Sequence, residues 1–470
     1  MQTTFIFVIM NMLSGMGYSA LPPLFPSLGI QKGLTETVIG FIIGIFDIAN
    51  ILTTSVLPYL TTKFKRIHLL YFATFCEATC TVIYGIIGYF FSSYYLLLIT
   101  MIITRIIHGC CNGIVATLVY SLTISLTEES KLKKALGNLE ISWCIGVSAS
   151  PVIDSIFFNI GGYPLPFLFL GLLLFISGYL SYLLSSEKTE SNNESEECAS
   201  FTMFLKHEEI LIILGAFIFG MISETFFYPS LTTHLEQNYG LPVKIGSLFF
   251  SILSFVYIIA LQFLDVTTQK FGLYGTSFIG LIMAALGVYM IFPYYPFPQK
   301  IISVIMGLTL IGGGGAPLFI PGLISISNQI KEFETEVDEL SLNDACSAIY
   351  DITLALGDFL GPIIGGYFST NYGFKYGCLI VSIAVFLYSL FFLFYFRKQI
   401  INKSTKIVIN EKTDEKELIN HPGFYKESNN DYSIPSNLNS ETVEKRKKCF
   451  SSVKKDENNI DFSYSKLNDI

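Results

Sequence analysis

Apolar runs long enough to cross a lipid bilayer recur along most of this chain, and they constrain its fold more than any other feature. Hydrophobic residues make up 51% of the 470 residues and charged residues only 14%, which is too little charge to cover a soluble protein of this size. Inside a bilayer the backbone must satisfy its own hydrogen bonds, and a run of about 20 apolar residues does so as a helix. The sequence therefore predicts an all-α, multi-pass membrane protein.

Twelve runs have this length, and we expect a transmembrane helix over each of them. They lie at roughly 4–25, 38–60, 68–91, 95–125, 136–159, 165–185, 209–232, 242–264, 273–294, 301–326, 343–368 and 373–396. With both termini in the cytoplasm, most lysines and arginines of the short loops fall on the cytoplasmic side. The positive-inside rule therefore favours this topology.

The chain also contains an internal repeat. Residues 139–163 (LEISWCIGVSASPVIDSIFFNIGGY) and 350–374 (YDITLALGDFLGPIIGGYFSTNYGF) match at a constant offset of 211, which aligns Glu140 with Asp351. Both copies hold an acid before a Gly-x-x-x-x-Pro pattern, which predicts close helix packing or gating. The residues of this pattern are Gly146, Pro151, Gly357, Gly361 and Pro362.

Two parallel halves with carboxylates inside them are typical of a carrier. We expect two pseudo-symmetric six-helix bundles, and four segments follow from the apolar and polar stretches. These are an N-terminal bundle at 1–185, a cytoplasmic linker at 186–208, a C-terminal bundle at 209–399 and a disordered cytoplasmic tail at 400–470.

Charged residues within the spans are the candidate functional groups, since charge at that depth is costly. Arg105 is the only lysine or arginine deep within a predicted span, and it either belongs to a proton-coupling network or forms a fixed salt bridge. Glu140 and Asp351 are the best acid pair for proton coupling, and Asp358 is a further candidate. The remaining acids Asp47, Glu77 and Asp154 fit structural or hydrogen-bonded roles better.

Glu224 comes just before an aromatic cluster that includes Phe227 and Tyr228. A carboxylate beside aromatic faces suits an amine, through ion pairing and cation–π attraction. The alternative is an aromatic packing stripe with a polar neighbour. Glu224, Phe227 and Tyr228 are therefore candidate substrate-binding residues.

Several segments resemble the major facilitator superfamily, and within it the vesicular amine and polyamine transporters. RIIHG (105–109) is similar to a fourth-helix Arg-x-x-x-Gly motif whose arginine is implicated in proton coupling. The two repeat copies resemble the antiporter-type Gly/Pro motif of helices five and eleven. AIYDIT (348–353) resembles the eleventh helix of the monoamine branch, whereas the Glu140 segment is closer to the polyamine branch. The resemblance implies a major facilitator fold and alternating access.

Two departures from that family stand out. The loop motif between helices two and three would fall on residues 58–66, where Pro58 and Thr62 replace a glycine and an aspartate. The first span also lacks the acid that monoamine carriers use there. The missing acid argues against a strict monoamine substrate, and the altered loop motif supports the alternative of a non-transporting membrane receptor with the same fold. A further alternative is a facilitator of a neutral or anionic solute, in which the acids serve only helix packing.

The expected function is proton-coupled exchange of an organic cation, so the predicted partners are the lipid bilayer, protons and a small cationic solute. No nucleophile–base arrangement, metal-ligand spacing or cofactor motif supports an enzyme, and no nucleic-acid partner is expected. Residues 414–419 and 464–467 fit short sorting patterns for adaptors, which favours a vesicular or endo-lysosomal membrane, with the plasma membrane as the alternative.

Overall fold

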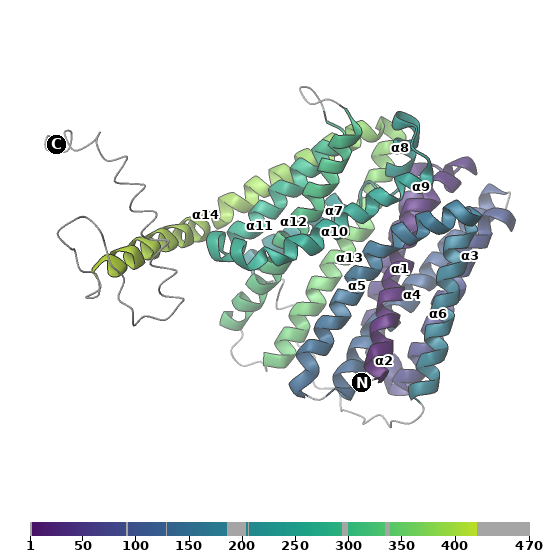
Figure 1. Cartoon of the computed structure of the whole chain (residues 1–470), viewed down its shortest axis with the longest axis horizontal. Coiled ribbons are helices and arrows are strands. Elements are labelled where there is room, and N and C mark those ends of the chain that lie inside the picture. The colour runs from purple at the N-terminus through teal and green to yellow at the C-terminus, as the bar shows by residue number, and fades with distance from the viewer. Residues whose placement is uncertain are drawn as a thin grey trace, which may run out of the picture. The chain divides into compact units, whose positions relative to one another are not determined.

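The computed structural model describes residues 2–90, 93–127, 129–185, 204, 206–293, 299–333 and 339–420. Residues 1–397 form one compact unit, and residues 398–470 belong to a second. The described part of the first unit is helical, as expected (Figure 1). The predicted linker at 186–208 lies largely outside the described residues, and so do residues 421–470 with the sorting pattern at 464–467.

Fourteen helices make up the described chain. The first half contains α1 (Gln2–Gln31), α2 (Glu36–Lys63), α3 (Arg66–Phe90), α4 (Tyr94–Leu126), α5 (Glu129–Gly161) and α6 (Pro164–Ser185). The second half contains α7 (Glu208–Thr225), α8 (Leu231–Tyr239), α9 (Val243–Gly246), α10 (Leu248–Gln262), α11 (Leu264–Ile291), α12 (Ile301–Phe333), α13 (Glu339–Tyr372) and α14 (Phe374–Asn420). Within the described residues, eleven segments are long and apolar enough to cross a membrane.

Several helices differ from the predicted spans. The eighth span, expected over 242–264, is divided into α9 and α10, and α11 begins at Leu264 rather than near 273. The seventh span, expected as one helix over 209–232, is divided into α7 and α8 by a turn at 226–230. Pro229 lies in that turn and has no backbone N–H to continue a helix. At the other end, α14 runs on to Asn420, past residue 399 where the second bundle was expected to end. Residues 400–420 contain neither glycine nor proline, so nothing in them stops the helix.

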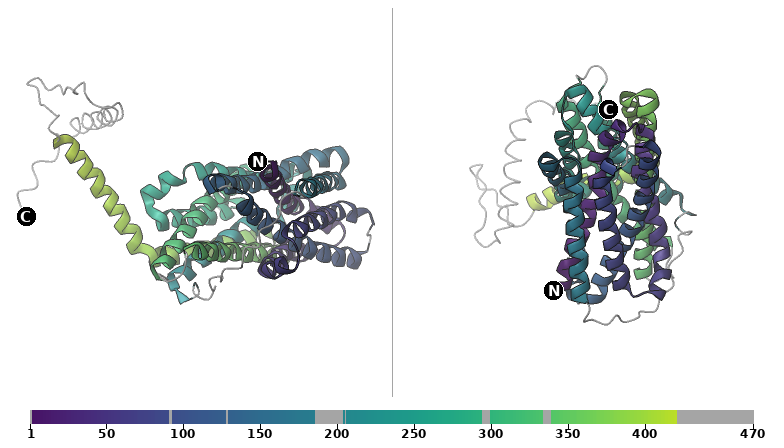
Figure 2. Two further views of the ribbon diagram at one scale, coloured as in Figure 1. Left: turned by 90° about the horizontal axis from the view of Figure 1, so that it is seen from below. Right: turned by 90° about the vertical axis from the view of Figure 1, so that its right-hand side faces the viewer.

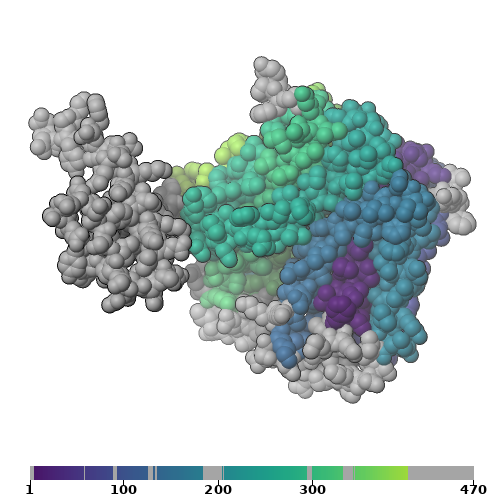
Figure 3. Space-filling model, in the orientation of Figure 1, coloured from purple at the N-terminus to yellow at the C-terminus, as the bar shows by residue number. Residues whose placement is uncertain are grey.

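Large apolar side chains cover the outer faces of the helices. Phe72 is 64% exposed, Leu172 55% and Ile160 69%. Such a surface would aggregate in water, whereas lipid tails solvate it. Figure 3 shows one such face, on which the surface of α1 is visible between α5 and α6. The exposure pattern agrees with a multi-pass integral membrane protein.

The helices form two halves that meet through two equivalent pairs. In the first half α1 packs on α5 and α3 on α6; in the second α11 packs on α12 and α7 on α13. Across the interface α2 packs on α13, and α5 packs on α10. Both views of Figure 2 show the helices of this unit running side by side. Because the repeat aligns α5 with α13, each copy crosses to the opposite half, as pseudo-symmetry requires.

Glycines set how closely the repeated helices pack. A Cβ atom at Gly146 would collide with the carbonyl oxygen of Met12 on α1, and one at Gly357 would collide with Met221 on α7. After α5 and α13 end, the aligned Gly162 and Gly373 both take a left-handed conformation, with φ of 70° and 88°. Residues with a Cβ rarely adopt that conformation. In both halves, the repeat thus has one glycine that allows close helix packing and another that follows the end of the helix.

The crossing of α2 and α13 is equally close. A Cβ at Gly40 would strike the carbonyl oxygen of Pro362, and one at Gly44 would strike that of Phe359. Helix α13 continues through Pro362, as α5 does through Pro151, so neither proline ends its helix. Small residues let two backbones approach in this way.

Hydrogen bonds hold the two halves together where α2 begins and α13 ends. The Thr37 N–H donates to Thr370 Oγ1 at 3.0 Å, and the Thr37 hydroxyl donates to the Gly366 carbonyl at 3.1 Å. On the other side of the interface, Ser155 of α5 donates to the Lys244 carbonyl at 2.6 Å. These contacts close the interface at that end of the halves, which we name the latched end.

Replacement of Gly40 by alanine tests this packing. The added methyl group has no room against the Pro362 carbonyl, so Gly40→Ala should destabilise the fold by about 1–3 kcal/mol, the usual cost of overpacking. A lower melting temperature of the purified protein in detergent would show it. In the control Gly137→Ala, nothing lies within 4 Å of the new Cβ. That variant should melt at or above the wild-type temperature, and equal melting of the two variants would contradict the close crossing.

Candidate functional site

Arg105 lies on α4 in the interior of the first half, with only 1% of its side chain surface exposed. Its guanidinium carbon is 4.4 Å from the centre of the Phe46 ring, which provides a cation–π contact. One terminal nitrogen, Nη2, is 3.5 Å from the Ile43 carbonyl oxygen, and Nε has no hydrogen-bond partner among the described residues. The cation is therefore enclosed but only loosely bonded.

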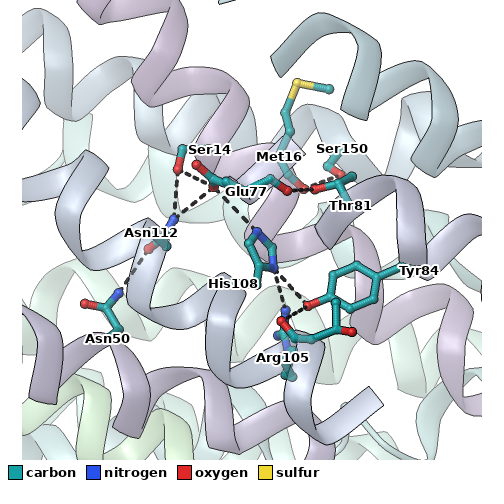
Figure 4. Close-up of polar contacts among 11 residues, drawn as sticks. Ser14, Met16, Asn50, Glu77, Thr81, Tyr84, Arg105, His108, Asn112 and Ser150 are labelled. Carbon is teal, nitrogen blue, oxygen red and sulfur yellow. Dashed lines mark hydrogen bonds and ion pairs between the residues drawn. The ribbon is translucent and has the colours of Figure 1, made fainter. Parts of the chain in front are cut away.

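His108 lies one helical turn after Arg105 and carries the network onward (Figure 4). Its Nδ1 is 3.1 Å from the Tyr84 hydroxyl and 3.5 Å from Arg105 Nη1. Its Nε2 is 3.5 Å from Glu77 Oε1, and both side chains are completely buried. The imidazole therefore stands between a buried cation and a buried carboxyl group.

Amide and hydroxyl donors surround the Glu77 carboxyl group. Ser14 of α1 donates to Oε1 at 2.7 Å, and Asn112 of α4 donates to the same oxygen at 3.4 Å and to Ser14 at 2.8 Å. Asn50 of α2 donates in turn to Asn112 at 3.0 Å. One polar network thus connects four helices of the first half, as Figure 4 shows.

Sequence reasoning identified Arg105 but gave no role to His108 or Asn112. A signal was present, because residues 105, 108 and 112 recur at helical spacing and share one face of α4. Glu77 was expected to be structural or hydrogen-bonded, and it is hydrogen-bonded. Nothing in the sequence shows which face of α3 meets that face of α4.

A second group of acids gathers where the halves meet. Asp47 of α2 is 6% exposed, and its charge interacts with that of Asp358 on α13. The Tyr18 side chain of α1 lies beside the Asp358 carboxyl, whose Oδ1 has no hydrogen-bond partner among the described residues. The Tyr18 ring is 5.4 Å from Phe46 and 6.0 Å from Trp143. Acids and aromatic rings from both halves therefore share one region.

Glu224 joins this region from α7. Its charge interacts with Asp358, and its carboxyl oxygen lies against Gly315 of α12 and beside Tyr257 of α10. Tyr228 is half-buried and packs against the apolar core of the first half, so it spans the interface.

Phe227 differs from its neighbours, because it is completely buried. Its ring centroid is 5.5 Å from that of Tyr228 and 6.0 Å from that of Phe250. Glu224 and Tyr228 therefore lie at the interface, whereas Phe227 is buried among the aromatic rings next to it.

The two repeat acids lie on the helices that cross the interface, and Tyr257 interacts with the charges of both Glu140 and Glu224. The side chains of Glu140 on α5 and Asp351 on α13 are exposed, and their charges interact across the interface. The Tyr120 hydroxyl donates to Glu140 Oε2 at 2.5 Å. Both acids lie toward the N-terminal ends of their helices, away from the latched end. Glu140 and Asp351, which the repeat aligns, thus interact at the end of the interface where charged groups are accessible.

The remaining repeat residues lie in helix contacts. A Cβ at Gly361 would strike Thr225 Oγ1 of α7, and the Pro362 carbonyl faces Gly40 of α2. Pro151 is buried within α5. Among the described side chains, no group of three or more His, Cys, Asp or Glu residues could hold a metal ion.

Comparison with known proteins gives consistent relatives. The family model described as Major Facilitator Superfamily matches residues 7–336. The mouse MFS-type transporter SLC18B1 is 24% identical over 382 residues, which cover 78% of this chain and 80% of that protein. The mouse synaptic vesicular amine transporter is 24% identical over 306 residues, which cover 65% of this chain and 56% of that protein.

Solved structures share the fold at lower identity. The nucleoside transporter NupG superposes with a TM-score of 0.67 at 13% identity, covering 84% of this chain and 99% of that one. A bacterial homologue of the human lysosomal transporter Spinster, in an inward-facing and occupied conformation, gives 0.65 at 11% identity over 85% and 97% of the two chains. These likenesses show the helical arrangement.

Replacement of Asn112 tests the buried network. Asn112→Leu removes the amide that donates to Ser14 and Glu77, and a buried acceptor that loses its donor costs about 1–3 kcal/mol. Thermal unfolding in detergent should therefore occur at a lower temperature. The control is Asn371→Leu, since Asn371 is exposed and bonds only the Tyr367 carbonyl of its own helix turn. If both variants melt alike, the network contributes no stability.

Proposed function

The chain belongs to the Major Facilitator Superfamily, and from this premise we propose that it exchanges protons for an organic cation by alternating access. It is a multi-pass membrane transporter, and its relatives include SLC18B1 and vesicular amine transporters. The proposal concerns what it carries and which ion drives it. Polyamines and monoamines are the proposed substrate classes, since amine carriers are among the relatives.

The observation that supports a cationic substrate is the acidic and aromatic region between the halves. Asp47, Glu224 and Asp358 come from three helices, and the charge of Asp358 interacts with those of the other two. A cation bound there would offset the mutual repulsion of the carboxylates and meet the aromatic faces of Tyr18 and Tyr228. A neutral or anionic solute would leave that repulsion in place.

We assign the amine to Glu224 and Tyr228, with Asp358 shared between substrate and proton. Phe227 then acts by supporting the Tyr228 ring at 5.5 Å rather than by contacting the amine. This retains two of the three residues expected from the sequence to bind substrate.

Proton coupling is assigned to Arg105, Glu140, Asp351 and Asp358. Glu140 and Asp351 carry like charges on the two helices that cross the interface. Drawing these helices together against unscreened repulsion is unfavourable, so a proton or a cation must first reduce the charge. The two helices can therefore draw together only when a proton or a cation is bound. An exchanger requires this link between ligand binding and closure of the interface.

With both termini in the cytoplasm, the latched end would face away from the cytoplasm, and Glu140 and Asp351 would be accessible from inside the cell. We propose a vesicular or endo-lysosomal membrane, where an acidic lumen supplies the protons.

Transport by the reconstituted protein tests the proposal. Proteoliposomes with an acidic interior should accumulate labelled spermidine or serotonin, and collapse of the pH gradient should abolish accumulation, because the gradient is the energy source. Flux that ignores the pH gradient would instead indicate a facilitator. Binding without flux would indicate a receptor.

Variants of the repeat acids test the coupling assignment. Glu140→Gln and Asp351→Asn should each lower gradient-driven accumulation by about tenfold or more, within the range of typical coupling free energies. Protein abundance should change much less, since both side chains are exposed. The control is Glu236→Gln, at an exposed acid of α8. Parallel loss of abundance and accumulation would show that the acids serve folding.

A further inference from the structure

We propose that Glu77 and His108 form an internal proton-binding site of the first half, and that Arg105 connects its occupancy to the substrate region. The inference rests on the proton coupling proposed above and adds Glu77 and His108, neither of which was expected from the sequence to take part in that coupling. It starts from three buried groups, Glu77, Arg105 and His108, each no more than 1% exposed.

The hydrogen-bond geometry fixes where the imidazole proton lies. Arg105 can only donate, so His108 Nδ1, at 3.5 Å from Arg105 Nη1, must act as an acceptor. The Tyr84 hydroxyl lies 3.1 Å from the same nitrogen and 3.4 Å from the Thr104 carbonyl oxygen, so it can donate to either acceptor. The ring proton of a neutral His108 is therefore on Nε2, which faces Glu77 Oε1. The resting state is a carboxylate, a neutral imidazole and a guanidinium in series.

Glu77 has one oxygen ready for a proton. Its Oε1 accepts from Ser14 and Asn112, whereas Oε2 is buried without a hydrogen-bond partner among the described residues. Buried polar atoms are nearly always paired, so an unpaired carboxylate oxygen requires an explanation. Binding of a proton converts the carboxylate to a neutral acid and removes its charge from the interior.

A fixed structural ion pair would look different. Arginine and carboxylate in a stable buried pair make short, often bidentate contacts. Here Glu77 and Arg105 lie on opposite sides of the His108 ring, and the contacts that connect them are 3.5 Å long. Arg105 Nε is unpartnered as well. The arrangement keeps the guanidinium free to respond when the charge on Glu77 changes.

Arg105 also interacts with an acid of the substrate region. The charge of Asp47 on α2 interacts with that of Arg105, and Phe46, the preceding residue, contacts the guanidinium. When Glu77 takes up a proton, Asp47 remains as the acid that balances Arg105. The guanidinium then competes with a bound cation for Asp47. Proton binding inside the first half therefore disfavours substrate binding at the interface, as exchange requires.

The site is close to the interface on the α1 side. A Cβ at Gly17 would lie 3.5 Å from His108 Nε2 and 3.7 Å from Glu77 Oε1, so the α1 backbone covers the pair without a side chain. The next residue, Tyr18, lies beside Asp358.

Other titratable groups approach the pair from the surrounding helices. From α3 these are Cys80 and Tyr84, and from α4 they are Cys111 and Arg105, while Asp47 of α2 interacts with Arg105. Arg105 is the cation among the groups that interact with His108. Because Arg105 lies against the imidazole, we assign the proton to Glu77, whose Oε2 has no hydrogen-bond partner among the described residues.

Infrared difference spectroscopy tests proton binding without a substrate. Acidification of the purified protein should produce a C=O stretching band of a protonated carboxyl group, part of which disappears in Glu77→Gln. The control is Glu236→Gln, altered at an exposed acid of α8, which should keep the component that Glu77→Gln loses. If Glu77→Gln has the same difference spectrum as the wild type, Glu77 takes up no proton and the inference is wrong.

Transport by His108→Gln tests the connection to Arg105. Uptake of labelled spermidine or serotonin driven by a pH gradient should fall by about tenfold or more, the loss of a typical coupling free energy. Exchange of the same amine across the membrane without a gradient should fall much less, because the substrate residues remain. The His108→Gln variant keeps the Glu77 carboxyl group. It therefore still tests the proposed coupling if Glu77→Gln does not fold. Unchanged gradient-driven uptake in His108→Gln would overturn the inference.

The matched control is His234→Gln in the second half. His234 is 6% exposed and packs against Phe292 and Phe374, with ring centroids 4.9 Å and 4.8 Å away. Burial lowers the pKa of His234 to about 4, so this histidine is neutral near neutral pH. Its replacement should leave gradient-driven uptake at the wild-type level. A wild-type protein without any response to the pH gradient would refute the proposed function, while the infrared band would still report on Glu77.

Discussion

Burial of the Arg105 charge is the constraint on which the organisation of the first half depends. A guanidinium with 1% exposure in an apolar bundle loses its hydration, a penalty of several kcal/mol that only neighbouring dipoles and charges can offset. Phe46 provides a ring face, Ile43 a carbonyl oxygen, and His108 a nitrogen acceptor. The contacts with Phe46 and Ile43 both hold α2 against α4, whereas His108 lies on α4 itself. The polar network of the half follows from the need to surround one cation.

The interface between the halves is set by a different requirement, the close approach of backbones. Gly44 of α2 lies against the Phe359 carbonyl of α13, and Asp47 lies one helical turn from Gly44 while Asp358 immediately precedes Phe359. The crossing that excludes a Cβ at Gly44 therefore also brings the two acids into one electrostatic environment. Sterically required glycines and charged residues are parts of a single contact.

Much of the fold could be predicted from the sequence, because hydrophobicity and repeat symmetry are properties of the chain itself. The apolar runs predicted the helices, and the repeat predicted the equivalence of α5 and α13. The division of the seventh span at Pro229 was missed, although its cause is local. Side-chain direction could not be predicted. Phe227 and Tyr228 lie in the turn between α7 and α8, where the turn geometry sets the direction of each side chain, and they face different surroundings despite being neighbours. Pairing of Glu77 with His108 depends on how α3 is rotated against α4, and both helices are apolar on most of their surface.

The position of Arg105 between an internal acid, Glu77, and an interfacial acid, Asp47, also gives a reason why protons would not cross the membrane without substrate exchange. If Glu77 and Asp47 were both charged and no cation were bound, one guanidinium would face two carboxylates, and the interior would retain an uncompensated negative charge. If Glu77 were protonated while a cation occupied the substrate region, the excess would be positive. The interior has the lowest net charge in two states of the protein. In one a proton is bound and no substrate is present, and in the other substrate is bound and the proton is absent. Movement between the two faces of the membrane is least costly from those states, because the protein interior stabilises net charge poorly. Obligatory exchange can thus arise from charge balance around a single buried arginine, without a separate device to sense each ligand.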